Sequence, residues 1–380
     1  MLTDKDISLI REAEFPVTKD WIYLNHLVRS PFPNSVVQAV NSYLTDRGLN
    51  GIIHGENWFR TVEHARELIA RLINCQLNEI AFIKNTSEGI CYIANGIDWH
   101  EGDNVITFNR EYPCNVYPWM NLKDKGVVLR FVHAADGRIK PDDIRNLIDG
   151  RTRVVNLSFV QFTNGFKSDL REIGDICREK GIIFLVDGTQ GVGALRLDIK
   201  EANIDALAVE GRKWLFGPDG TGFLYCSKGL LKRIKVTEIG AASVINARDF
   251  LNYDFTLLPD TRRFESGILN IAGIYGLKAA LRLVIDIGID AIEERILMLT
   301  DLLCRGLEEK GYQVLSPRCE GEKSGIVSFI NDRCPNQELD RMLMDKRIFV
   351  SVKEDMVKVS PHFYNTEEEI ERFVEILGER

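Results

Sequence analysis

The sequence predicts an α/β fold: a large domain in which a mainly parallel sheet lies between helices, and a smaller C-terminal α+β domain. From about residue 60, short apolar runs alternate with segments of helical periodicity, and this repeated order requires crossover connections that produce a parallel sheet covered on both faces. After Gly267 the pattern changes to long helices and short strands. The chain has 380 residues, of which 45% are hydrophobic and 27% charged, which is enough for two domains.

The elements of the large domain follow in order along the chain. Helical periodicity over 61–75 leads into a strand at 79–84 and a second helix at 88–97. The other strands and helices are expected in the following places: strands at 104–109, 127–132, 153–160, 182–187, 205–210 and 222–226, and helices at 140–148 and 168–181. Ligands of such sheets bind at the carboxyl ends of the strands, so the residues just after each strand are the first candidates for a site.

The C-terminal part has a different pattern. A helical region over 271–288 continues into 291–311, and the remaining elements are strands at 325–330, 347–352 and 356–361 and helices at 336–346 and 366–380. We therefore expect a large domain formed by residues 26–270, a small domain formed by residues 271–380, and an N-terminal segment, residues 1–25, that joins the small domain.

Composition and charge exclude several classes of protein. With 48 basic and 56 acidic residues, the net charge is −8, so nucleic-acid binding is not expected as the main role. The eight cysteines and six histidines lack C-x-x-C, H-x-x-x-H and H-E-x-x-H spacing, which indicates reduced thiols and no metal site. No apolar run approaches the roughly 20 residues that cross a bilayer, and the N-terminus is unlike a secretory signal. We expect a cytoplasmic protein with no membrane partner.

A candidate anion site follows the strand expected at 79–84. In Asn85-Thr86-Ser87-Glu88-Gly89, Thr86 and Ser87 can cap the next helix. The free N–H groups of a capped helix N-terminus bind anions, phosphate in particular. A helix cap without a ligand is the alternative interpretation.

An acid and a lysine follow two later strands. Asp187 ends the apolar run 182–187, and its carboxylate needs a cationic or protonated partner because burying it alone costs several kcal/mol. Lys213 follows the run 205–210 and precedes an aromatic, glycine-rich turn, where poor solvation lowers the pKa of the amine. A partly neutral amine can form a Schiff base. Taken alone, Asp187 is also compatible with a helix cap and Lys213 with a surface lysine.

Together, in this order, these features resemble the class V aminotransferase family of pyridoxal phosphate (PLP) enzymes, which includes cysteine desulfurases, isopenicillin N epimerase-like proteins and kynureninase. The resemblance covers nearly the whole chain, and further matching segments are Tyr23-Leu24-Asn25, Gln161-Phe162-Thr163-Asn164-Gly165-Phe166, Arg263-Phe264-Glu265-Ser266-Gly267 and Ser360-Pro361-His362-Phe363-Tyr364-Asn365-Thr366. It implies fold type I, PLP as cofactor and a homodimer. It also implies that Lys213 holds the cofactor covalently and moves the proton at Cα, and that Asp187 pairs with the pyridinium nitrogen.

The resemblance implies further cofactor contacts. Gln190 would hydrogen-bond the ring phenolate oxygen, with Gln161 a weaker candidate for the same edge. Thr86, Ser87 and the adjacent N–H groups would hold the phosphate. Tyr112, in Glu111-Tyr112-Pro113-Cys114-Asn115, falls where relatives place a ring-stacking side chain, and a tyrosine that packs a loop is the alternative.

Two departures concern the phosphate. Where relatives read Ser-Gly-His-Lys, this chain reads Glu210-Gly211-Arg212-Lys213. Arg212 can hold a phosphate bidentately, whereas Glu210 would repel it, so Arg212 is assigned to the phosphate and Glu210 receives no role. The family's Gly-Thr, whose hydroxyl reaches the phosphate of the neighbouring subunit, is here Gly267-Ile268.

Other departures concern the substrate. Lys358 stands where relatives carry an arginine that binds the α-carboxylate, and a lysine supplies charge but only a point contact. Asn25 and Arg29 lie in the stretch 25–31, near the N-terminus, which borders the active site in relatives; Arg29 is equally compatible with a solvated loop. Desulfurases attack sulfur with a loop cysteine, but residues 347–360 contain no cysteine, and Cys334 does not match that loop. A persulfide mechanism is therefore disfavoured.

The sequence predicts a PLP-dependent enzyme that acts at the α-carbon of a small amino acid or amine. Transamination is the first interpretation, and epimerisation or C–S β-elimination the second, because the same residues serve all of them. A catalytically lapsed PLP-binding protein, suggested by Glu210, Ile268 and Lys358, and a binding protein without cofactor are the alternatives from other classes.

Overall fold

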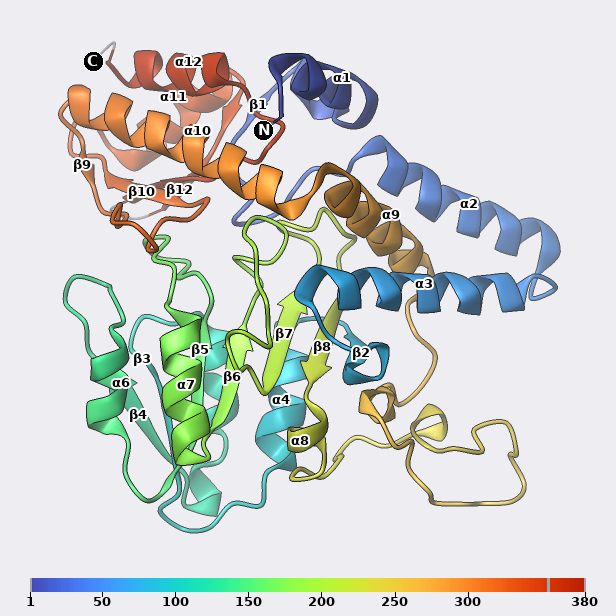
Figure 1. The fold of residues 1–380 in the computed structure, drawn as a ribbon. Coiled ribbons are helices and arrows are strands. Elements are labelled where there is room, and N and C mark those ends of the chain that lie inside the picture. The colour runs from blue at the N-terminus through green and yellow to red at the C-terminus, as the bar shows by residue number, and fades with distance from the viewer. Residues whose placement is uncertain (1, 354–355, 379–380) are drawn as a thin grey trace.

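The computed structural model describes residues 2–353 and 356–378, and a seven-stranded sheet forms its centre (Figure 1). The strand order is β2-β8-β7-β6-β5-β3-β4. Their bounds are β2 Ile80–Ile83, β3 Asn104–Phe108, β4 Val128–Val132, β5 Thr152–Ser158, β6 Ile183–Asp187, β7 Ala206–Glu210 and β8 Gly222–Cys226. All neighbouring pairs from β4 to β7 are parallel, and β8 is antiparallel to both β7 and β2. The predicted α/β class with a mainly parallel sheet is confirmed.

Helices cover both faces of this sheet, which explains why strands such as β6 are buried along their whole length. One face packs against α3 Gly55–Ile73, α6 Pro141–Leu147, α7 Leu170–Lys180 and α9 Ile271–Ile287. The other face packs against α4 Thr86–Gly96, α5 Tyr117–Met120 and α8 Lys228–Leu231. No helix within residues 2–353 and 356–378 is both long and apolar enough to cross a bilayer.

The C-terminal region contains a second, antiparallel sheet with the order β12-β13-β10-β9. Its elements are α10 Ile289–Glu309, β9 Gln313–Val314, β10 Val327–Ile330, α11 Asn336–Asp345, β11 Ile348–Phe349, β12 Ser351–Lys353, β13 Met356–Val359 and α12 Glu367–Gly378. At the N-terminal end lie α1 Asp4–Glu14, β1 Ile22–Tyr23 and α2 Asn34–Asn50, and β1 pairs in parallel with β11. Residues 379 and 380 of the predicted last helix, and residues 354 and 355, lie outside the described residues.

The helical region predicted from 271 to 311 is divided at Gly288. This glycine has φ +93°, a conformation that favours glycine, and it separates α9 from α10. The buried face of α9 belongs to the core of the large sheet, whereas α10 joins the C-terminal core from Leu299 onward. The division into domains stays a prediction, and these contacts favour a boundary at Gly288 over one at residue 270.

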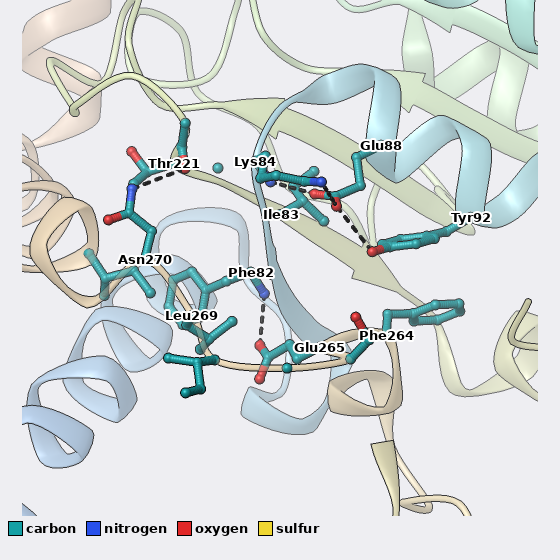
Figure 2. Close-up of a pocket in the computed structure, with 16 residues that line it drawn as sticks. Phe82, Ile83, Lys84, Glu88, Tyr92, Thr221, Phe264, Glu265, Leu269 and Asn270 are labelled. Atoms are coloured by element: carbon teal, nitrogen blue, oxygen red, sulfur yellow. Dashed lines mark hydrogen bonds and ion pairs between the residues drawn. The ribbon is translucent and has the colours of Figure 1, made fainter. Parts of the chain in front are cut away.

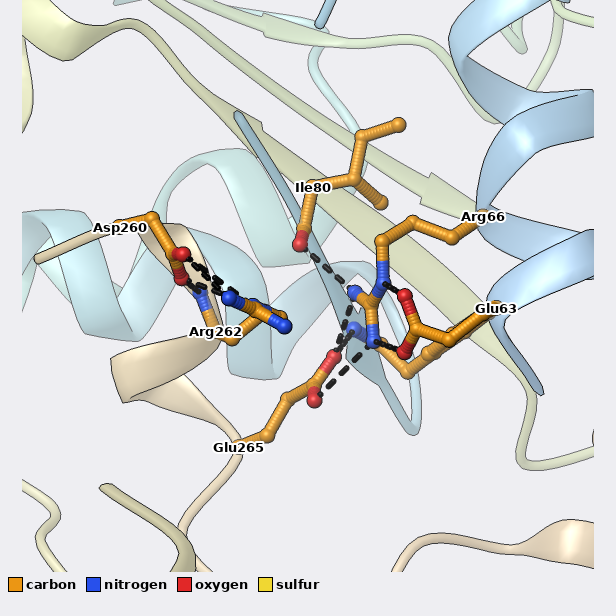
Figure 3. A network of polar contacts seen from close by, with 7 residues as sticks. Glu63, Arg66, Ile80, Asp260, Arg262 and Glu265 are labelled. Carbon is orange, nitrogen blue, oxygen red and sulfur yellow. Dashed lines mark hydrogen bonds and ion pairs between the residues drawn. The ribbon is translucent and has the colours of Figure 1, made fainter. Parts of the chain in front are cut away.

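A buried charged network fixes the segment that leads into α9 (Figure 3). Arg66 of α3, 1% exposed, donates from Nη1 to Glu265 Oε1 at 2.8 Å and to Ile80 O at 2.7 Å. Glu265 Oε1 also accepts from the backbone N–H of Phe82 at 2.8 Å. The network therefore joins α3, β2 and the turn before α9, and its hydrogen bonds compensate the desolvation of the two charges.

A cluster of buried histidines and aromatic rings lies where the N-terminal segment meets the C-terminal region. His26 is fully buried, with Nδ1 2.7 Å from Ser360 O and Nε2 2.9 Å from Tyr364 Oη. His362 is also fully buried, and its Nε2 lies 3.1 Å from Trp214 O. Burial lowers the pKa of His26 to about 3 and the pKa of His362 well below its usual value. Both rings are therefore neutral in the folded protein.

Because both histidines are buried in the neutral form, we expect the protein to lose stability in acid. Between pH 6.5 and pH 3, His26 is protonated in the unfolded chain but stays neutral in the folded protein. The free energy of unfolding therefore falls as the pH drops below about 6.5. His26 alone contributes about 2 kcal/mol to this loss between pH 6.5 and pH 5. The free energy of unfolding is measured by urea denaturation at pH 6.5 and at pH 5. Its decrease between the two pH values should be smaller in His26→Asn than in the wild type, by about the contribution of His26. Equal losses in the two proteins would contradict the assignment.

Candidate active site

A cavity of about 210 Å³ lies at the carboxyl ends of β5, β6 and β7, beside the N-terminus of α4. Parallel neighbouring strands bring their carboxyl ends to one edge of the sheet, so turns far apart in the sequence meet there. The cavity is lined by Asn85, Thr86, Ser87, Tyr112, Cys114, Ser158, Phe162, Asp187, Thr189, Gln190, Glu210, Arg212 and Lys213. Seven of the predicted cofactor residues therefore line one cavity: Thr86, Ser87, Tyr112, Asp187, Gln190, Arg212 and Lys213.

Lys213 is 7% exposed and lies in the turn after β7. Its Nζ is 5.4 Å from the centre of the Tyr112 ring, and its backbone carbonyl accepts from Ser30 Oγ at 2.5 Å. Burial lowers the pKa of the amine, although the carboxylates of Asp187 and Glu210 oppose this change. The amine thus has the environment that the sequence predicts for a nucleophile or base.

Asp187 ends β6 and is 6% exposed. Oδ1 accepts from the backbone N–H of Thr189 at 2.9 Å, while Oδ2 accepts from Asn115 Nδ2 at 3.1 Å and lies 3.4 Å from Cys114 Sγ. Among the residues that the structure describes, the groups bonded to this carboxylate are all neutral. A buried carboxylate with only neutral partners is well suited to pair with a protonated ring nitrogen.

A second buried acid, Glu111, is connected to Asp187 through Asn115, and the sequence prediction missed it. Glu111 accepts at 2.8 Å from the backbone N–H of Ser158 and at 2.5 Å from its Oγ. Asn115 Nδ2, which bonds Asp187, also donates to Glu111 at 2.9 Å. Burial raises the pKa of Glu111. Glu111 and Asn115 follow the strand predicted at 104–109, and this position at a strand end was the available signal.

The end of the cavity at α4 differs in detail from the prediction. The residue that caps α4 is Asn85, whose Oδ1 accepts from the N–H of Glu88, so the assignment of the cap to Thr86 and Ser87 is wrong. Asn85 precedes the helix with extended backbone, whereas Thr86 and Ser87 are its first residues. Thr86 Oγ1 instead lies 2.7 Å from Thr189 Oγ1. The first N–H groups of α4 have no acceptor within the helix and remain suited to an anion.

The two predicted glutamines are engaged with protein groups. Gln190 Nε2 donates to Leu27 O at 3.0 Å, and its Oε1 accepts from Trp214 Nε1 at 2.9 Å, which leaves one N–H of the amide for a ring oxygen. Gln161 is fully buried, and its Nε2 donates to Glu111 at 2.6 Å. Gln161 Oε1 has no partner among the described residues. Gln190 is therefore the better placed of the two.

The three candidate substrate residues, Asn25, Arg29 and Lys358, make different contacts. Lys358 of β13 places its Nζ 4.8 Å from the ring centre of Phe162, which lines the cavity. Burial, and secondly the charge of Lys353, lower the pKa of Lys358 to about 8. Asn25 is buried and its Oδ1 has no partner among the described residues, whereas Arg29 is exposed and pairs with the exposed Asp219 at 3.2 Å. None of these three residues belongs to the described cavity wall, and Lys358 contacts it through Phe162.

A second cavity, of about 230 Å³, lies between β2, with the turn after it, and the segment 264–270 (Figure 2). Its wall includes Ile268, which is 99% exposed, and Lys84, whose Nζ pairs with Glu88 at 3.0 Å. Figure 2 shows Glu265 directed toward the backbone nitrogen of Phe82. Lys84 is the only lysine or arginine of its described wall and is already paired, so this cavity offers less for catalysis than the one at Lys213.

The residues around Lys213 fit pyridoxal phosphate. The cavity combines a buried amine for the aldehyde, a buried carboxylate hydrogen-bonded to neutral groups for the pyridine nitrogen, an aromatic ring, and a helix N-terminus for the phosphate. Within residues 2–353 and 356–378, no cluster of three or more His, Cys, Asp or Glu side chains could hold a metal ion.

Comparison with known proteins agrees with this fit. The family model described as "Aminotransferase class-V" matches residues 22–373. A probable cysteine desulfurase from Methanothermobacter thermautotrophicus is 31% identical over 96% of this chain and 96% of its own length.

Solved structures are similar over almost the whole chain. The apo structure of a cysteine desulfurase from Thermococcus onnurineus has a TM-score of 0.89 and 27% identity, and the match covers 98% of this chain and 97% of that one. The cystine C–S lyase C-DES, in complex with its reaction product cysteine persulfide, has a TM-score of 0.88 and 25% identity, with 96% and 99% of the two chains covered. A C-DES variant with glycine covalently linked to its PLP cofactor has a TM-score of 0.89 and 25% identity, with 97% and 98% covered.

Proposed function

The chain belongs to the class V aminotransferase family of PLP-dependent enzymes, and we propose that it removes the α-proton of a small amino acid with Lys213 as the base. One observation carries the proposal: the buried Lys213 amine and the buried Asp187 carboxylate line the same cavity. When bound there, the cofactor supplies an electron sink for the bond that breaks at Cα.

Each side chain of the cavity has a separate task in this proposal. Lys213 would hold the cofactor aldehyde, and its Nζ would accept and return the proton at Cα. Asp187 would hold the protonated ring nitrogen, and Tyr112 would cover the ring. Thr86, Ser87 and the N-terminus of α4 bind the phosphate. The lowered pKa of Lys213 supports its role, since a base must be partly neutral to accept a proton.

For the bond that breaks, we propose the C–S bond of a sulfur-containing amino acid such as cysteine or cystine, eliminated without a protein thiol. The names of the similar cysteine desulfurases and of the C–S lyase support the substrate class. The single thiol of the described cavity wall is Cys114, and burial raises its pKa well above the usual value, so it is protonated and a poor nucleophile. This supports elimination over persulfide formation on the enzyme.

Transamination, the first interpretation of the sequence, uses the same lysine and is distinguished by its products. Elimination from cysteine yields pyruvate, ammonia and sulfide. Transamination releases no ammonia, and it yields more than one equivalent of keto acid per enzyme only when an amino acceptor is present. We expect ammonia and sulfide from cysteine, or ammonia and cysteine persulfide from cystine. Keto acid without ammonia would favour transamination, and cofactor binding with no response to any amino acid would favour a lapsed enzyme.

Lys358 is proposed to attract the substrate α-carboxylate. Replacing it by methionine should raise KM about 10- to 100-fold with a smaller change in kcat, because one charge-assisted hydrogen bond is lost from the ground and transition states alike. In the wild type, KM should also rise as the pH increases through about 8, where Lys358 loses its proton. Lys358→Arg should remove that rise, since arginine stays charged. A pH profile of KM that is the same in both proteins would contradict this role.

A homodimer and a cytoplasmic location complete the proposal. The resemblance supports the dimer. Ile268, which replaces the threonine that reaches the neighbouring subunit in relatives, is 99% exposed, and burial of this side chain at an interface would remove it from water. The eight cysteines are all free, which supports a reducing compartment. Light scattering of the purified protein tests the proposed homodimer, because it measures the mass of the particle in solution.

A further inference from the structure

Glu210, which had no role in the sequence prediction, lies at the phosphate end of the cavity. Its backbone N–H donates to Thr189 Oγ1 at 3.1 Å, and the same hydroxyl lies 2.7 Å from Thr86 Oγ1. The Thr189 hydroxyl therefore bridges the backbone of Glu210 and the side chain of Thr86, the first residue of α4. Glu210 lines the cavity together with Thr86, Ser87 and Arg212.

The carboxylate of Glu210 forms an ion pair with the guanidinium of Arg212. Glu210 Oε1 accepts from Arg212 Nε at 2.6 Å, and the two side chains are only 15% and 25% exposed. The exposed Asp219 lies farther away, at 3.9 Å from Arg212 Nε. The guanidinium assigned to the phosphate is therefore neutralised by an internal anion, and a phosphate entering the cavity meets a carboxylate as well as a cation.

We propose that Glu210 competes with the phosphate of the cofactor for Arg212, so that the chain binds this phosphate less tightly than the helix N-terminus and the arginine alone would allow. The inference rests on the proposed function, because it takes PLP as the ligand. It predicts that removing the charge of Glu210 strengthens binding of the phosphate. The charge of Glu210 also raises the pKa of Lys213, but a change in that amine affects every aldehyde that it binds, with or without a phosphate.

The test compares two aldehydes, PLP and pyridoxal, which differ by the phosphate alone and react with the same lysine. Their apparent dissociation constants are measured by absorbance titration of the wild type, Glu210→Gln and Glu210→Ser. The preference for PLP over pyridoxal should increase about tenfold in both variants, as expected for one partly exposed charge pair. Asp219→Asn, the matched control, should change the preference by less than about twofold because Asp219 is more distant and exposed.

The outcomes separate this inference from the proposed function. A preference that stays unchanged or falls in both Glu210 variants, with folding confirmed by circular dichroism, overturns the inference and assigns Glu210 to holding Arg212 in place. Serine, the residue of relatives at this position, serves as the second variant if glutamine fails to fold. A wild-type protein that takes up neither aldehyde would overturn the proposed function and the inference together.

Discussion

Replacing Lys213 by alanine is expected to reduce exchange of the substrate α-proton with solvent by about 10³-fold or more and to abolish covalent attachment of the cofactor. The amine is both the anchor of the aldehyde and the base at Cα, and no other lysine belongs to the described cavity wall. The measurement is deuterium incorporation at Cα by NMR, together with borohydride reduction and peptide mapping of the labelled side chain.

A matched control separates loss of the amine from loss of the fold. Lys213→Arg keeps a positive charge in the cavity but supplies no amine of the required reactivity, so it should be as inactive as alanine while keeping wild-type thermal stability. Added methylamine should restore part of the exchange in Lys213→Ala, because the small amine can occupy the vacated space. Borohydride labelling of a different residue in the wild type would overturn the assignment.

The sequence was sufficient to predict the residues at the strand ends. Asp187 ends an apolar run and Lys213 follows the next one, and because β6 and β7 are parallel neighbours, both residues lie at one edge of the sheet. The same logic predicted the α/β class and the seven strands of the large sheet. These features depend on local hydrophobic pattern and on a general rule of topology, and both can be read without knowing the strand order.

The residues that were missed depend on the strand order. Glu111 and Asn115 follow β3, which is separated from β6 in the sheet by β5 alone, although β4 lies between β3 and β5 in the sequence. The hydrophobic pattern does not reveal this crossover, so the contact between Asn115 and Asp187 was not predicted. Pairing of Arg29 with Asp219 likewise depends on how two loops run, and loops carry no periodic pattern.

Asp187 is expected to have the second largest effect. Asp187→Asn should reduce kcat by on the order of 10³-fold, because the neutral amide cannot stabilise a protonated ring nitrogen where charge develops during the reaction. The substitution also leaves two donors, Asn115 Nδ2 and the N–H of Thr189, competing for a single amide oxygen.

This variant can be distinguished from the lysine variant by a second measurement. Lys213 is intact in Asp187→Asn, so borohydride should still label it, while deuterium incorporation at Cα falls. Cys114→Ala is the control, since it removes the weakest of the described donors to Asp187 and should change the exchange rate by less than about tenfold. If Asp187→Asn kept more than a tenth of the wild-type exchange rate, the ring nitrogen would have to be supported by a different group, and Glu111, linked to Asp187 through Asn115, would be the next acid to replace.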